Sequence, residues 1–206
     1  MAETSKAELK HGIDYTGAKM GMWIFLFTEL IFFGGLFLLY SVYRMKYTAD
    51  FHNSASELDI FLGTANTAIL LTSSASLTLA ISSMKKGQKG LSLVCQFITI
   101  LLGAIFLYNK YAEWSVHIHH GLYPDSPELL NMSRGKIIFF SLYYVMTGIH
   151  GLHVLIGICV VSAMSVFSIR GTVRQDDFVK LENTGLYWHF VDIVWIYLFP
   201  LFYLIT

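Results

Sequence analysis

Five long apolar stretches, separated by short polar segments, dominate this chain of 206 residues. They cover about 20–43, 59–84, 89–110, 136–168 and 184–205. Each is long enough to cross a bilayer, which takes ~20 residues in a helix. The backbone must satisfy its own hydrogen bonds in lipid, and the stretches lack the period-2 alternation of a membrane β-barrel. The pattern therefore predicts an all-α integral membrane bundle of five transmembrane helices.

Composition agrees with a membrane protein and excludes several other classes. Hydrophobic residues make up 55% of the chain and charged residues 14%, against about a quarter for a soluble domain. Acidic and basic residues balance at 14 each, so no nucleic-acid partner is expected. Residues 1–19 are polar and lack the apolar core of a signal peptide. We interpret them as a cytoplasmic segment ahead of a transmembrane domain over 20–206.

The distribution of Lys and Arg predicts how the bundle is oriented. Nine lie on the N-terminal side of the membrane: Lys6, Lys10, Lys19, Lys85, Lys86, Lys89, Arg170, Arg174 and Lys180. Five are counted on the other side: Arg44, Lys46, Lys110, Arg134 and Lys136. Because basic residues are enriched in cytoplasmic loops, the N-terminus is predicted to be cytoplasmic and the C-terminus outside.

Three ionisable residues inside the apolar stretches need an explanation. Glu29 in the first span and His189 and Asp192 in the fifth are expected at similar depths. A charge at the centre of a membrane helix costs roughly 2.5–3.5 kcal/mol unless it is compensated. His189 and Asp192 are i,i+3 neighbours, and we hypothesise that Glu29 joins them. The sequence leaves two interpretations open, a proton relay with a reactive buried carboxyl or a structural polar clamp.

The remaining histidines form two groups. His150 and His153 are i,i+3 neighbours in the fourth span, a spacing that can bind metal or haem, and His117, His119 and His120 follow the third span. Further ligands at matching depth are lacking for the first pair. We therefore expect interhelical hydrogen bonds for that pair. For the second group a metal site is conceivable, and a solvated or interfacial amphipathic extension is the favoured interpretation. Nucleotide-binding and catalytic motifs are absent, so the sequence predicts no metal site and no catalytic residue in this chain.

Aromatic, small and sulfur-containing residues suggest further contacts. Trp23, Trp188 and Trp195 are predicted at the lipid or an interface. Cys95 and Cys159 lie in apolar stretches and are predicted to be membrane-buried apolar residues. Several glycines are expected to allow close helix contacts. They are Gly34, Gly35, Gly148, Gly151 and Gly157.

Five segments together carry a resemblance to a known family. They are "GMWIFLFTELIFFGGLF", "NTAILLTSSASLTLA", "YAEWSVHIHHGLYPD", "TGIHGLHVLIG" and "LYWHFVDIVWIYLFPLFYL". In this order, over roughly 15–205, the chain resembles subunit III of the haem–copper oxidases. It looks like the five-helix bacterial form rather than the seven-helix form, whose two additional N-terminal helices help to form a lipid-filled cleft.

The resemblance implies a non-redox subunit of a proton-pumping terminal oxidase in a bacterial cytoplasmic membrane. Such an oxidase moves electrons from cytochrome c to oxygen. Its haem and copper belong to subunits I and II, so this chain is expected to bind neither, while bound phospholipid is expected. The family's subunit III packs against subunit I, stabilises it and supports proton uptake; contacts with subunit II and further small subunits are also implied.

The resemblance also marks individual residues. Glu29 matches the family's buried glutamate that reacts with carboxyl reagents. Four further positions, His150, His153, His189 and Asp192, match its histidine and "WHFVD" motifs. The family pattern assigns none of them a chemical step.

Other functions remain open from the sequence. The chain could serve a quinol oxidase or a relative associated with nitric oxide reductase. In a different class, it could be a stand-alone proton channel or small transporter that uses Glu29 and the histidines. Proton flux through the purified chain in liposomes would favour the channel, whereas co-purification with a haem-bearing partner would favour the subunit.

Overall fold

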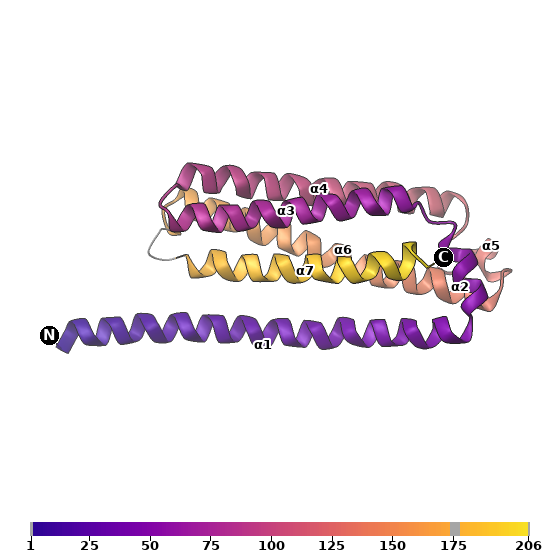
Figure 1. Ribbon diagram of the computed structural model, residues 1–206, viewed down its shortest axis with the longest axis horizontal. Coiled ribbons are helices and arrows are strands. Elements are labelled where there is room, and N and C mark those ends of the chain that lie inside the picture. Colours follow the sequence, from indigo (N-terminus) through magenta and orange to yellow (C-terminus); the bar gives the residue numbers. More distant parts are fainter. Residues whose placement is uncertain (1, 174–177, 206) are drawn as a thin grey trace.

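The computed structural model describes residues 2–173 and 178–205, with side chains from residue 16 onward. Within these residues the chain is helical, without β-strands, and its long helices run along one common axis (Figure 1). Five helices are long and apolar enough to cross a membrane. They are α1 (Ala2–Lys46), α3 (Ile60–Lys85), α4 (Lys89–His119), α6 (Arg134–Ile169) and α7 (Val179–Tyr203). The predicted all-α bundle of five membrane helices is confirmed.

Two short helices lie at one end of the bundle, the end that also holds the last described residues of α7 (Figure 1). These are α2 (Thr48–Ala55) and α5 (Pro127–Leu130). The periodicity of the long apolar stretches gave no sign of either helix. The opposite end of the bundle carries the α3–α4 turn and the segment between α6 and α7.

Local sequence sets several helix ends. The Asp59 carboxylate accepts hydrogen bonds from the backbone N–H groups of Phe61 at 2.9 Å and Leu62 at 3.2 Å, and so caps the start of α3. Gly87 ends the same helix with φ = 74°, a left-handed conformation that glycine adopts without steric cost. Ser133 caps α6 through the N–H of Lys136.

Helix α4 continues well beyond the predicted end of its apolar stretch at residue 110. Neither glycine nor proline occurs between Lys110 and His120, and Gly121, with φ = 67°, follows the helix end. As a result Lys110 and Glu113 lie on the helix, and both are buried. The sequence interpretation had counted Lys110 among the outer charges.

This position of Lys110 changes the charge count that predicts orientation. Removing it from the outer group leaves nine basic residues on the N-terminal side and four on the other. Arg174 lies outside the described residues, as do the side chains of Lys6 and Lys10. The direction of the bias is unchanged and its size is larger.

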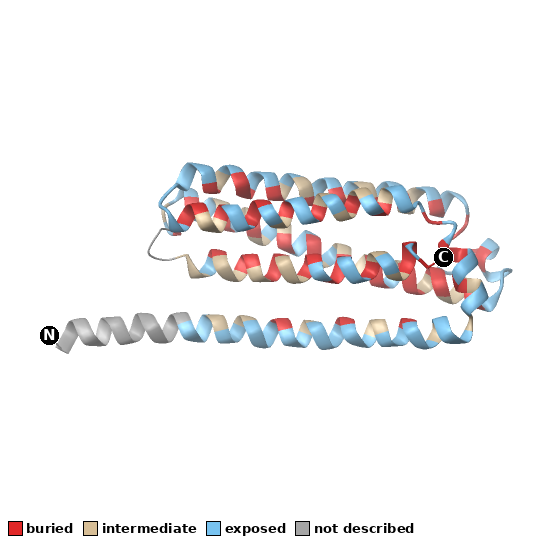
Figure 2. Cartoon of the chain, in the orientation of Figure 1, coloured by how far each residue is buried: buried red, intermediate tan, exposed pale blue. Residues whose placement is uncertain are grey.

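Four of the long helices form the packed bundle, and α1 lies along one side of it. In the apolar window of α7, 56% of residues are buried, against 11% in that of α1. Figure 2 shows the same contrast as a mostly exposed α1 beside helices that carry buried residues at intervals along their length. A single amphipathic pattern therefore does not describe α1, because almost its whole circumference is apolar and unburied within this chain.

Two of the three tryptophans predicted at lipid or an interface are buried instead. Trp188 is 1% exposed, and its indole fills the space beside Gly103 of α4 and Gly157 of α6. A Cβ at either glycine would come within 2.9 Å of that ring. Its N–H donates to the Ser73 hydroxyl at 3.0 Å, which allows the polar edge of the ring to be buried.

Trp195 is also 1% exposed, and its N–H donates to Thr67 at 3.0 Å. Only Trp23, which is 61% exposed, has the predicted outward position. Hydrophobicity alone could not separate these cases, since an aromatic ring in a membrane protein is stable both at lipid and in the core.

Gly34 and Gly35, predicted at helix contacts, face open space.

Candidate functional site

Glu29 forms the polar contact between α1 and α6. Its Oε2 lies 3.2 Å from Nε2 of His153, and Nδ1 of the same ring lies 2.8 Å from the backbone oxygen of Ile149. A carbonyl oxygen only accepts hydrogen bonds, so Nδ1 carries a proton and donates it. The contact to Glu29 then holds one further proton, either on the carboxyl or on Nε2. The pair is therefore either a neutral hydrogen bond or an ion pair.

His189 forms a second polar contact, between α7 and α3. Its Nδ1 lies 2.5 Å from the Ser74 hydroxyl, and its Nε2 lies 3.3 Å from the Thr78 hydroxyl. Thr78 donates its own proton to the backbone oxygen of Ser74 at 3.0 Å. Its oxygen is therefore left to accept from the Nε2–H of His189, and Nδ1 accepts from Ser74.

Asp192 lies one turn further along α7 and is 4% exposed. Neither of its carboxyl oxygens has a hydrogen-bond partner of good geometry, although the Ser74 hydroxyl is near enough to interact with it. A buried carboxyl without a partner is costly. This residue therefore needs an explanation beyond helix packing.

The hypothesised contact of Glu29 with His189 and Asp192 is wrong. Glu29 pairs with His153 of α6, while His189 turns toward α3. The position of each residue along its span predicts similar depths in the membrane for the three groups. Depth alone does not give the direction in which each side chain leaves its helix. The expected hydrogen-bonded interhelical histidine is confirmed for His153.

His150 does not make the hydrogen bond that was expected of it. Its ring is fully buried, stacked on Trp195 with centroids 5.2 Å apart and edge-on to Phe106 at 5.6 Å. Neither ring nitrogen has a hydrogen-bond partner. It thus acts as an aromatic side chain in the core, although it is only three residues before His153.

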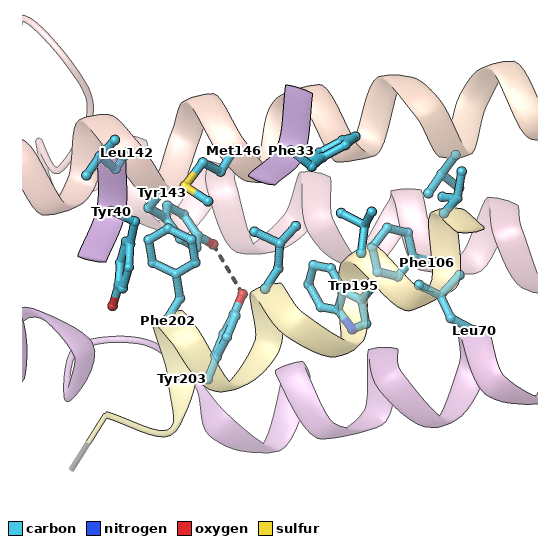
Figure 3. Close-up of a cluster of buried hydrophobic side chains, with 14 of the residues drawn as sticks. Phe33, Tyr40, Leu70, Phe106, Leu142, Tyr143, Met146, Trp195, Phe202 and Tyr203 are labelled. Atoms are coloured by element: carbon cyan, nitrogen blue, oxygen red, sulfur yellow. Dashed lines mark hydrogen bonds between the residues drawn. The ribbon is translucent and has the colours of Figure 1, made fainter. Parts of the chain in front are cut away.

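A buried charged cluster at the α5 end of the bundle was not predicted. The Lys110 ammonium donates hydrogen bonds of 2.9 Å to each of three oxygens, on Glu113, Tyr143 and Tyr203. The two phenols donate to the other carboxylate oxygen of Glu113 at 2.7 and 2.6 Å. Figure 3 shows the two tyrosines meeting across the aromatic core near Trp195. The cluster joins α4, α6 and α7.

A sequence signal for part of this cluster did exist. Lys110 and Glu113 are i,i+3 neighbours, a spacing at which opposite charges can pair on one helix face. The apolar stretch ends at Lys110, so hydropathy gives no reason to extend the helix to Glu113. The two tyrosines carry no such signal, because their meeting depends on how three helices pack.

The cysteines and outer histidines give no ligand group. Among the described side chains, those of residues 16–173 and 178–205, no three His, Cys, Asp or Glu side chains lie close enough together to hold a metal ion. His117 is buried on α4 beside Tyr143, whereas His119 and His120 are exposed. Cys95 is buried as predicted, and Cys159 is exposed on the outside of this chain.

The fold and these contacts define a multi-pass membrane bundle whose interior polar groups join one helix to another. Comparison with known proteins adds the family. Residues 3–206 match the family model described as cytochrome c oxidase subunit III. The chain belongs to this family, and so it is a subunit III of a haem–copper oxidase complex.

Curated relatives cover nearly the same region. The chain is 33% identical to a probable quinol oxidase subunit 3 of Staphylococcus saprophyticus, over 91% of this chain and 88% of the relative. It is 32% identical to cytochrome c oxidase subunit 3 of Thermostichus vulcanus, over 91% and 87%. A haem–copper oxidase subunit I+III of Aeropyrum pernix is 30% identical over 91% of this chain and 22% of that longer protein.

Proposed function

We propose that this chain is the non-redox subunit III of a proton-pumping terminal oxidase in a bacterial cytoplasmic membrane. It packs against subunit I, which it stabilises, and it supports proton uptake by the complex. Haem and copper are carried by subunits I and II. The exposed apolar surface is covered by those subunits, by further small subunits and by phospholipid.

One observation carries the partnership with subunit I. In the Aeropyrum pernix relative, a subunit I and a subunit III are named as parts of one chain. Two segments joined in a single protein are held at high effective concentration, and this arrangement suits segments that work in contact. Helix α1 is mostly exposed on this chain (Figure 2), and its exposed residues include Ile24, Phe27 and Leu38, which offer apolar surface for such a neighbour.

The proposed support of proton uptake rests on the Glu29–His153 pair. The pair holds one proton that can reside on either partner, and its side chains are only partly exposed, at 20% and 14%. The proton can therefore shift between the carboxyl and the imidazole without changing the net charge of the pair, and its release leaves one carboxylate beside a neutral imidazole. The same contact also clamps α1 to α6, so the relay and the clamp must be separated by experiment.

Substitution of Glu29 separates the two roles. Glu29→Gln keeps a hydrogen bond to His153, because the amide N–H can donate to Nε2, but it removes the exchangeable proton. If the pair serves proton uptake, this variant slows uptake by the purified complex while the chain stays bound and haem content stays normal. Thr28→Val is the control, since the Thr28 hydroxyl is exposed and bonds only to its own helix. Unchanged uptake in Glu29→Gln contradicts the relay.

Purification under mild detergent tests the subunit assignment itself. A tagged chain should bring down a partner with a haem spectrum, and the chain alone in liposomes should conduct no protons. Proton flux through the isolated chain without haem-bearing partners would contradict this proposal and support the stand-alone channel.

We propose cytochrome c as the electron donor of the complex. A quinol donor is the second candidate, because the names of close relatives divide between the two kinds of oxidase. Oxygen consumption by the purified complex decides between them. Turnover with reduced cytochrome c confirms the first donor, and turnover with quinol alone overturns it.

A further inference from the structure

We propose that Asp192, Ser74 and His189 form a short proton-exchange chain between a buried carboxyl and a groove beside α1. This inference deepens the proposed support of proton uptake and rests on it. It adds Ser74, a residue that no sequence pattern singled out, and it gives the "WHFVD" segment of α7 a physical task.

The buried end of the chain is Asp192. It is 4% exposed and both of its oxygens lack a hydrogen-bond partner. It follows His189 by three residues on α7, and the Ser74 hydroxyl of α3, which lies 2.5 Å from that imidazole, also interacts with the Asp192 carboxyl. A buried carboxyl with no cation beside it is most stable when it holds a proton. That proton can then be donated to the oxygen of Ser74.

The open end of the chain is His189. Its ring lines a groove together with Lys19 of α1 and Glu182 and Gly185 of α7. It also lines the neighbouring apolar groove between α1 and α7, beside Trp23 and Phe190. The imidazole therefore has one side on open space and the other on Ser74.

Charged groups mark the groove as the end that lies near water. Glu182 pairs with Lys19 at 2.9 Å and with Lys85 at 2.5 Å, so the carboxylate of α7 lies between cations of α1 and α3. Glu182 lies about two to three turns before His189 and Asp192 on α7, and Lys85 lies about two to three turns beyond Thr78 and Ser74 on α3. The side chains of Lys19 and Lys85 are 35% and 45% exposed on this chain, so this end of the groove is open.

The hydrogen bonds of the chain can run in one consistent direction. A protonated Asp192 donates to the oxygen of Ser74, the Ser74 hydroxyl donates to Nδ1 of His189, and Nε2–H donates to Thr78. Ser74, His189 and Thr78 then each donate one proton and accept one, and Asp192 donates one. With the hydrogen bonds in this direction, each group between the carboxyl and the groove holds a proton that it can pass to the next group.

Proton release follows by small shifts along these bonds. The Asp192 proton passes to Ser74 as the Ser74 proton passes to Nδ1, leaving a carboxylate and an imidazolium. The imidazolium then gives its Nε2 proton to water in the groove. The net change is one proton moved from the carboxyl to the groove, and uptake is the reverse.

Infrared spectroscopy of the purified complex tests the chain. On transfer to heavy water, the carbonyl stretch of a protonated Asp192 should shift as its proton is replaced. The band is assigned by its loss in Asp192→Asn and its displacement in Asp192→Glu. In Ser74→Ala we expect the shift to slow by about tenfold or more, equal to about 1.4 kcal/mol in the exchange barrier. Ser74→Thr, which keeps the hydroxyl, should restore the rate.

Thr72→Ala is the matched control, because Thr72 is an exposed hydroxyl on the same helix that bonds only to Ala68. His189→Phe is a second test of the chain, with the same slowing expected. Variants are compared at equal haem content. The proposal is overturned if no band depends on Asp192, or if Ser74→Ala exchanges as fast as Thr72→Ala. The exchange rate is measured without turnover, so slowed exchange in Ser74→Ala together with unaffected proton uptake supports the chain and contradicts the proposed function alone.

Discussion

Lys110 shows how a single residue can be stable where hydropathy alone would exclude it. All three of its ammonium protons are donated, to Glu113, Tyr143 and Tyr203. The ammonium also lies over the Tyr143 ring, 4.8 Å from the centroid. Charge, hydrogen bonds and ring contact together compensate for the loss of water.

Removing one charge of this pair should cost more than removing both. Lys110→Met leaves the Glu113 carboxylate buried and uncompensated, and we expect the chain to lose about 3–5 kcal/mol of stability. In the double variant Lys110→Met/Glu113→Gln, no charge remains, so the loss should be much smaller. The measurement is the temperature at which the chain is lost from the complex. Lys86→Met, at an exposed position, is the control; equal losses in the single and double variants would contradict this account.

Trp188 allows a second residue-scale prediction. Its ring fills the space left by Gly103 and Gly157, and its N–H is bonded to Ser73. Trp188→Ala should therefore cost about 3–5 kcal/mol, as for other large core residues. Trp23→Ala removes the same side chain from an exposed site and should cost far less. Thermal loss of the chain from the complex reports both, and similar effects at the two sites would show that Trp188 does not pack as described.

At the scale of elements, α1 differs from its neighbours in how it is held. Side-chain contacts join it to the bundle at three levels, through Lys19, Glu29 and Tyr40. The Tyr40 hydroxyl donates to the backbone oxygen of Leu201, one of the last four carbonyls of α7, which have no partner within their helix. A helix with so little buried surface depends on such contacts for its register.

Tyr40→Phe should weaken this attachment. The change removes one hydrogen bond and leaves the ring in place, so we expect a loss of roughly 0.5–1.5 kcal/mol. Tyr108→Phe removes a hydroxyl from an exposed ring and should have no effect. Stepwise heating of the complex, with the retained chain quantified at each step, measures the difference. A Tyr40→Phe variant as stable as Tyr108→Phe would rule out this role.

The five long helices were predictable from the sequence because membrane length and backbone hydrogen bonding allow few alternatives, whereas α2, α5 and the extension of α4 lie outside the apolar stretches. Asp59 likewise marked the start of α3, since a capping carboxylate acts within three residues. Contacts between helices were not predictable in the same way. The rotation of α7 that directs His189 to Ser74 and buries Trp188 depends on packing against α3, α4 and α6, and hydropathy records none of that.

The orientation of the bundle across the membrane is a property of the whole molecule. With Lys110 inside the bundle, nine basic residues on the N-terminal side face four on the other. Lys85 and Lys86 adjoin the α3–α4 turn, and Lys89 opens α4. Short loops of this kind are the ones that follow the positive-inside rule. The bias therefore predicts that the α3–α4 turn is cytoplasmic and the α5 segment is outside.

Labelling of single cysteines in intact cells tests this orientation. Gln88→Cys in the α3–α4 turn should react with a membrane-impermeant thiol reagent only after lysis. Met132→Cys, just after α5, should react in intact cells, because both side chains are exposed on the chain. The parent chain, whose Cys95 and Cys159 lie within spans, gives the background. The reverse labelling pattern would show that the molecule has the opposite orientation. The groove that holds His189, Lys19 and Glu182 would then open to the outside, where a proton-exchange chain could not serve proton uptake from the cytoplasm.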